Sequence, residues 1–336
     1  MEKISWGIIG CGDVTEMKSG LAFNKIAGSQ LIAVMRRDAE KAKDYAARHG
    51  VPKWYADVNQ LINDPEVNAV YVATPPQSHA EYAIKAMQAG KPVYVEKPMA
   101  AGYSDCILMN KVAAETKVPL FVAYYRRSLP YFIQIKNLLT AQSIGQILGA
   151  SIRLYISPRK TDLDPSNLPW RVNPEIAGGG YFYDMACHTL DILDYMFGPI
   201  AEVSGVLANR GGLYAAEDVV AASLKFENGV PASGLWCFTA AEENKFDQVE
   251  ILGSNGRIIF STFDFSPIIL ENKAGRKEFL PANPLHIQQC MIEEVVKELR
   301  GDGVSPSNGI SAARTNHVMD IILDKLRHNQ ETCSRN

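Results

Sequence analysis

The chain opens its first structural unit with Ile4-Ser5-Trp6-Gly7-Ile8-Ile9-Gly10-Cys11-Gly12-Asp13-Val14-Thr15. An apolar run of strand length leads into a G-x-G turn, and a helical pattern follows it. This order is typical of the first strand, phosphate turn and first helix of a dinucleotide-binding domain. The first glycine permits the tight bend, and the second lets the backbone approach a pyrophosphate. We therefore predict that Gly10, Gly12, Asp13 and Val14 contact a dinucleotide; the alternative is a purely structural turn.

The same alternation of strand and helix continues to about Ala123. The pattern predicts strands at 4–9, 30–35, 69–73, 92–95 and 119–123, and helices at 13–25, 39–49, 78–89 and 103–116. Repeated strand–helix units indicate a parallel sheet with helices on both faces. Residues 1–123 are thus predicted to form an α/β, doubly wound Rossmann domain.

The pattern changes after Ala123. A helix is expected at 130–139, a strand at 146–156, a proline-rich loop at 157–176, a helix from Gly178 to about Phe197, and helices at 285–299 and 309–326. The pairs Asn228-Gly229 and Asn255-Gly256 are signals of β-hairpins between alternating strands. Residues 124–336 are therefore predicted to form an α+β domain with an open, mostly antiparallel sheet. We expect its last helix to pack back on the first domain.

Composition narrows the functional classes. The 336 residues carry 34 Lys and Arg against 37 Asp and Glu, a net charge of −3, and 47% of them are hydrophobic. This balance gives no electrostatic footprint for nucleic acid, and no apolar run reaches the length of a membrane helix. The six cysteines form no C-x-x-C pair and suggest neither a zinc site nor a disulfide framework. We expect a cytoplasmic protein without a signal peptide and without a metal.

The end of the second predicted strand reads Met35-Arg36-Arg37-Asp38. An acidic residue there would accept a hydrogen bond from the ribose 2′-hydroxyl of NAD(H), whereas arginine can clamp the 2′-phosphate of NADP(H). Asp38 is better explained as the cap of the following helix. We therefore favour NADP(H) at Arg36 and Arg37, with NAD(H) possible if both arginines are merely solvated.

Five residues follow the predicted strands at their carboxyl ends: Gly10, Arg36, Thr74, Lys97 and Tyr124. In a doubly wound sheet these ends share one edge, where ligands bind. A lysine near a nicotinamide can hydrogen-bond a substrate oxygen and exchange a proton with it. Lys97 is thus a candidate catalytic residue and Tyr124 a candidate substrate contact; the alternative for Lys97 is a solvated surface side chain.

A second set of chemical groups follows the glycine cluster at Gly178 to Gly180. Asp184 and His188 are four residues apart, so they share one face of a helix. A carboxylate one turn from an imidazole can orient it or act with it in a proton relay. The alternatives are an ordinary helix pair and two ligands of a metal, for which no further ligand is evident.

Trp170-Arg171 lies in the proline-rich loop before the glycine cluster. A tryptophan can cover an aromatic cofactor ring, and an arginine can contact its phosphates. The alternative is a loop that is anchored by a buried tryptophan.

Together, Gly10-x-Gly12, Glu96-Lys97-Pro98, Trp170-Arg171 and Gly178-Gly179-Gly180-x3-Asp184-x3-His188 resemble the Gfo/Idh/MocA family of oxidoreductases. The resemblance implies NAD(P)-dependent oxidation or reduction of a sugar, polyol or related carbonyl compound. It further implies that the open sheet of the second domain mediates a homodimer or homotetramer.

Residue roles also follow from this resemblance. Lys97 and His188 would be the acid–base residues, with Asp184 binding substrate or relaying protons. Seven residues would line the cofactor or its edge: Thr74, Pro75, His79, Glu96, Arg127, Trp170 and Arg171.

Two positions depart from the common family pattern or vary within it. Tyr125 stands where many members have a small polar residue or asparagine, so the pocket near the nicotinamide differs. Members also vary at the position of Arg36, so the family by itself leaves the choice of cofactor open. The competing functions are a non-catalytic dinucleotide-binding sensor or regulator and a dihydrodiol or anhydro-sugar dehydrogenase of the same family.

Overall fold

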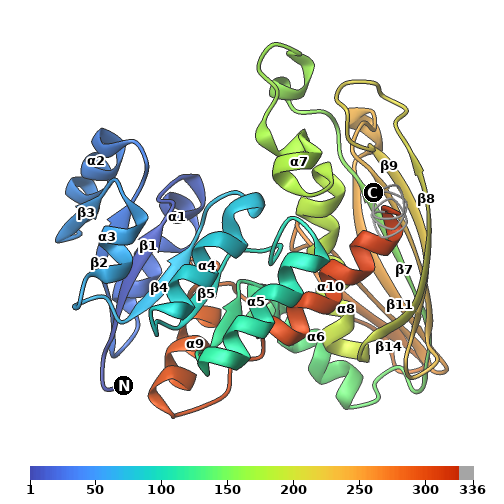
Figure 1. The fold of residues 1–336 in the computed structure, drawn as a ribbon. Helices are drawn as coiled ribbons and strands as arrows, with labels where there is room; N and C mark the ends of the chain where they lie inside the picture. The colour runs from blue at the N-terminus through green and yellow to red at the C-terminus, as the bar shows by residue number, and fades with distance from the viewer. Residues whose placement is uncertain (325–336) are drawn as a thin grey trace. The chain divides into compact units, whose positions relative to one another are not determined.

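The computed structural model describes residues 1–324, which fall into two compact units coloured by residue number in Figure 1. The first unit contains Met1–Leu129 and Asn283–Ala313, and the second contains Pro130–Ala282 and the residues from Arg314 onward. The chain thus returns to the first unit over 283–313, which a division into 1–123 and 124–336 does not include. That one part binds cofactor and the other substrate stays a prediction. The expected end of the last helix at Leu326 lies outside the described residues.

A six-stranded parallel sheet forms the centre of the first unit. Its strands are β1 (Ile4–Ile9), β2 (Ser29–Met35), β3 (Lys53–Tyr55), β4 (Ala69–Val72), β5 (Val93–Val95) and β6 (Leu120–Val122). They pair in the order β3-β2-β1-β4-β5-β6, which reverses direction beside β1 as in dinucleotide-binding folds. The predicted α/β class is confirmed. The sequence analysis missed β3, because this short edge strand contains no fully buried residue and therefore no apolar run.

Helices connect these strands. They are α1 (Asp13–Met17), α2 (Ala39–His49), α3 (Val58–Asn63), α4 (His79–Gln88), α5 (Tyr103–Thr116) and, from the returning segment, α9 (Gln289–Arg300). The predicted helix at 13–25 is wrong beyond Met17, because a 3₁₀ turn at Gly20–Lys25 replaces it. Gly20 is a poor helix former, and a Cβ atom there would collide with the Tyr45 hydroxyl.

The second unit is built on an eight-stranded mixed sheet. Its strands are β7 (Ile147–Tyr155), β8 (Ile200–Ala208), β9 (Val219–Phe226), β10 (Pro231–Cys237), β11 (Phe246–Gly253), β12 (Gly256–Phe260), β13 (Ile268–Asn272) and β14 (Gly275–Phe279). The order is β14-β13-β12-β11-β7-β10-β9-β8, and only the pair β7–β10 is parallel. Both predicted hairpins are present, between β9 and β10 and between β11 and β12. The predicted open, mostly antiparallel sheet is therefore confirmed.

Helices α6 (Pro130–Thr140), α7 (Pro174–Ala177) and α8 (Cys187–Phe197) belong to this unit. Helix α10 (Gly309–Ile322) begins in the first unit and ends in the second. Within residues 1–324, no helix has both the length and the apolar character needed to cross a membrane.

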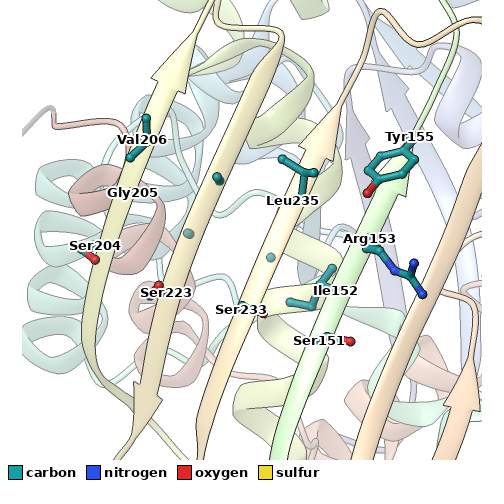
Figure 2. Close-up of a pocket in the computed structure, with 13 residues that line it drawn as sticks. Ser151, Ile152, Arg153, Tyr155, Ser204, Gly205, Val206, Ser223, Ser233 and Leu235 are labelled. Atoms are coloured by element: carbon teal, nitrogen blue, oxygen red, sulfur yellow. The ribbon is translucent and has the colours of Figure 1, made fainter.

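One face of the second sheet carries small side chains in register across four strands. Ser204, Ser223, Ser233 and Ser151 stand side by side on β8, β9, β10 and β7. The next outward row is Val206, Ala221, Leu235 and Arg153. Figure 2 shows the pocket that these rows line. This part of the face is thus flat and presents few long side chains.

Candidate functional site

Parallel pairing brings the carboxyl ends of the first unit's strands to one edge. Gly10, Arg36, Thr74, Lys97 and Tyr124 follow β1, β2, β4, β5 and β6 there. Tyr124 is almost fully buried, while the Lys97 side chain is half-buried. The edge predicted from the sequence to hold ligands therefore exists.

The glycine turn has room for a phosphate group at one position and not at the other. Gly10 has φ +94°, and a Cβ atom there would lie 2.7 Å from Thr74 Cγ2. A Cβ atom on Gly12 would meet nothing within 4 Å. Asp13 and Val14 follow at the start of α1, exposed and half-buried respectively. The open space beside Gly12 fits the close approach of a pyrophosphate that this turn permits.

The two arginines after β2 differ in their surroundings. Arg36 donates a hydrogen bond from Nη1 to the carbonyl oxygen of Cys11, at 3.1 Å, so its guanidinium lies beside the glycine turn. Arg37 is exposed. Asp38 accepts a hydrogen bond from the backbone N–H of Lys41 and caps α2, as predicted. Two guanidinium groups are thus available next to the turn, and Asp38 is engaged elsewhere.

Thr74 and Pro75 follow β4, and the Thr74 hydroxyl accepts a hydrogen bond from Ser78 at 2.8 Å. His79 is completely buried beneath them. Its Nε2 lies 2.7 Å from the carbonyl oxygen of Thr74, and its Nδ1 lies 3.0 Å from that of Pro98. His79 therefore joins the loop after β4 to the loop that carries Lys97, facing backbone oxygens.

Glu96 is buried directly before Lys97 and is held by three donors. Tyr71 Oη donates to its Oε1 at 2.5 Å, and Gln288 Nε2 donates to the same oxygen at 2.6 Å. The backbone N–H of Lys97 donates to Oε2 at 3.1 Å. Sequence reasoning missed Tyr71 and Gln288, because one lies inside a strand and the other is nearly two hundred residues away. Their hydrogen bonds fix the end of β5 where Lys97 emerges.

Arg127 is also buried. Its Nη1 donates to the carbonyl oxygen of Pro306 at 2.7 Å and to Ser311 Oγ at 3.1 Å, and its guanidinium lies over the Tyr124 ring. Arg127 thereby connects the segment after β6 to the returning segment 283–313. Its predicted place along the cofactor stays a prediction.

The second unit contains the other candidate residues. Arg171 stacks on the Trp170 ring at 4.5 Å, and its Nε lies 3.4 Å from Asp184 Oδ2. Asp184 lies in a π-helical turn at Phe182–Ala186, and His188 lies in the first turn of α8. His188 is 5% exposed. The structure therefore brings the predicted Trp170-Arg171 pair to the predicted Asp184, through an ion pair that the sequence analysis did not anticipate.

A buried carboxylate anchors the proline-rich loop. Asp162 is 1% exposed and accepts hydrogen bonds from Tyr181 Oη at 2.7 Å and from the backbone N–H of Arg159 at 2.8 Å. Tyr181 follows the glycine cluster, where a Cβ atom on Gly180 would collide with Ala216. No motif in the sequence marked Asp162, since an aspartate in a loop is usually solvated.

Comparison with known families matches both parts of the chain. Residues 4–124 match the oxidoreductase family with an NAD-binding Rossmann fold, and residues 132–259 match the GFO/IDH/MocA C-terminal domain. The chain belongs to the Gfo/Idh/MocA family. It is accordingly an NAD(P)-dependent oxidoreductase, and the predicted resemblance is confirmed.

Individual relatives agree with this assignment. Oxidoreductase P35 of Formosa agariphila is 38% identical over 95% of this chain and 98% of its own length. The 1,5-anhydro-D-fructose reductase of Ensifer adhaerens is 26% identical over 90% of each. A solved levoglucosan dehydrogenase with NADH and levoglucosan has a TM-score of 0.86 over 96% of each chain, and at 23% identity it shows the shared fold.

This Gfo/Idh/MocA chain offers acid–base groups and phosphate-binding groups, with no metal centre apparent. Within residues 1–324, no three His, Cys, Asp or Glu side chains gather as metal ligands would. The chemistry available to the described side chains is therefore hydrogen bonding and proton transfer to a substrate beside the dinucleotide.

Proposed function

We propose that this protein interconverts a carbonyl and an alcohol on a sugar, polyol or related compound, with NADP(H) as the coenzyme. Levoglucosan, anhydrofructose and aldoses appear in the names of similar proteins. The observation that carries the proposal is the presence of Lys97 after β5 together with Asp184 and His188 at α8. A protein that only binds a dinucleotide needs none of these three side chains.

Bound nicotinamide would supply or accept the hydride at the substrate carbon. Lys97 and His188 would act as the acid–base residues, binding the substrate oxygen and handling its proton. Asp184, ion-paired with Arg171, would bind substrate or relay protons for His188. Trp170 and Arg171 would line the edge of the cofactor, and Tyr124 would contact substrate.

The preference for NADP(H) rests on Arg36 and Arg37. Arg36 lies against the Cys11 carbonyl beside the glycine turn, and Asp38 is engaged as a helix cap. A guanidinium can bind the 2′-phosphate in a bidentate manner. Equal dissociation constants for NADPH and NADH, measured by fluorescence titration, would contradict this preference.

The catalytic proposal is tested with Lys97→Ala. NADPH-dependent turnover is first measured on a panel of carbonyl sugars and polyols. With the best substrate, Lys97→Ala should lower kcat by about a hundredfold or more while the dissociation constant of NADPH changes little. Retained activity in Lys97→Ala would rule out the role given to this lysine.

Two alternatives have specific outcomes. Binding of NADPH without turnover on any member of the panel would favour a sensor or regulator. Turnover of a dihydrodiol in preference to sugars would favour the other enzyme class, since dihydrodiol dehydrogenase of Xenopus laevis is 27% identical over 96% of this chain.

We further propose that the protein is a cytoplasmic homodimer or homotetramer that associates through the small-residue face of β7, β8, β9 and β10. The serine row and the Val206, Ala221 and Leu235 row let a second sheet approach closely. The other end of the same sheet instead carries ion pairs, such as Arg257 with Glu271.

A further inference from the structure

The connection between β12 and β13, residues 261–267, is organised by one carboxylate on β11. Asp247 accepts hydrogen bonds from three consecutive backbone N–H groups. Thr262 donates to Oδ1 at 3.1 Å, while Phe263 and Asp264 donate to Oδ2 at 2.6 and 3.1 Å. Three amides that point to one side chain fix the backbone of this turn, because each would otherwise need its own partner.

The base of the same turn is closed by a second set of bonds. The backbone N–H of Ser261 donates to Tyr131 Oη at 3.2 Å, and that hydroxyl donates to the carbonyl oxygen of Ser266 at 2.7 Å. Phe265 adopts φ +48° and packs edge-on against the Tyr131 ring. With both its base and its tip fixed, the turn has little freedom to change conformation.

The turn presents two consecutive residues to two consecutive residues of α8. Thr189 Oγ1 donates to Thr262 Oγ1 at 3.1 Å. The Phe263 and His188 rings meet edge to face, with centroids 5.8 Å apart at 77°. An aromatic neighbour in this geometry restricts the orientation of the imidazole.

Keeping a carboxylate at this place has a cost. Burial raises the pKa of the Asp247 carboxyl above its usual value, although its amide hydrogen bonds act in the opposite direction. A residue that is costly to bury and that fixes one turn against one imidazole is better explained by function than by stability alone.

We propose that Asp247 is a positioning residue that, through the turn Thr262–Asp264, sets Phe263 against His188 and fixes the orientation of its imidazole for proton transfer. The inference rests on the acid–base role proposed for His188. No motif in the sequence pointed to Asp247 or Phe263, because the contact joins residues that are far apart in the chain.

The placement is tested by NMR of protein with ¹³C-labelled histidine, in which His188→Asn identifies the His188 signal. The Phe263 ring shifts this signal, so Phe263→Leu and Asp247→Ala should both move it. Asp247→Asn keeps one acceptor oxygen and should move it less. Asp264→Ala is the matched control, since it removes an exposed neighbouring carboxylate and should leave the signal unchanged.

Kinetics test the consequence. Phe263→Leu and Asp247→Ala should lower kcat about tenfold with the dissociation constant of NADPH unchanged, and Asp247→Asn should recover part of the loss. If Asp247→Ala does not fold, Phe263→Leu carries both measurements. A His188 signal that does not move, or a moved signal with wild-type kcat, would overturn the proposal. Wild-type kcat in His188→Asn would instead overturn the acid–base role of His188, which is a separate result from the shifts.

Discussion

Two glycines of one turn illustrate the residue scale. Gly10 lies in the left-handed region, and an added Cβ would press on Thr74 and on the Ala73 carbonyl, whereas Gly12 faces open space. The same substitution should therefore have different effects at these neighbouring positions.

Gly10→Ala should lower the free energy of unfolding by about 1–3 kcal/mol, because both φ and the contacts oppose it. Gly12→Ala should melt like the wild type but bind NADPH about tenfold more weakly, since the methyl group occupies the space that a pyrophosphate approaches. Thermal denaturation and NADPH titration of both variants measure this. Equal loss of stability in both would show that Gly12 is only structural.

His79 predicts a pH dependence. Burial lowers its pKa, although the Thr74 carbonyl and Glu96 act in the opposite direction. The unfolded chain, with a histidine pKa of about 6.5, then binds the proton more tightly than the folded protein. The contribution of His79 to stability is therefore complete above about pH 6.5 and declines as the pH falls below it.

Urea denaturation between about pH 7.5 and 5 should show this decline, and it should be smaller in His79→Gln, which cannot titrate. The difference between the two proteins isolates His79 from the other histidines. The same slope in both would show that His79 does not contribute to the pH dependence.

At the scale of elements, the end of β5 depends on the returning segment. Gln288, 1% exposed, donates to the buried Glu96 carboxylate, and Glu96 in turn accepts the Lys97 N–H. Segment 283–313 thereby supports the strand end that presents Lys97, although it lies far away in the sequence.

Gln288→Leu should lower the free energy of unfolding by about 2 kcal/mol, because a buried carboxylate loses a donor. Tyr94→Phe is the matched control, since it removes only the 3.2 Å hydrogen bond from Tyr94 Oη to Gln288 Oε1 and should cost about 1 kcal/mol or less. Chemical denaturation compares the two variants. A larger loss in Tyr94→Phe would show that the bond to Glu96 is not the important one.

At the scale of the whole molecule, the two ends of the second sheet differ. The strands β7 to β10 present small side chains on their outer face, whereas Arg257 and Arg276 join β12 and β14 to Glu271 of β13 through ion pairs. Only the first kind of surface suits close packing against another sheet.

Leu235→Arg should therefore reduce the oligomer to smaller species, because it places a charge in the row of small residues. Leu252→Arg is the matched control, as it introduces the same side chain at another exposed leucine on β11. Light scattering after size-exclusion chromatography gives the mass of each variant. Dissociation by Leu252→Arg alone would assign self-association to another part of the surface.

The sequence alone was sufficient for the elements whose signals are local. The apolar run before Gly10, the Asp38 cap and the Asn-Gly hairpins predicted their strands, helix and turns, because adjacent residues determine these features. The edge strand β3 and the end of α1 at Met17 escaped, since burial on an edge and packing of Gly20 against Tyr45 leave no periodic pattern.

What the sequence by itself determined is the family, the α/β and α+β architecture and the candidate residues Lys97, Asp184 and His188. Only the tertiary structure decided which side chains support them: Gln288 on Glu96, Arg171 on Asp184, and Phe263 on His188. The physical reason is that hydrogen bonds and ring contacts join atoms that are close in space, whereas a sequence pattern records only neighbours along the chain.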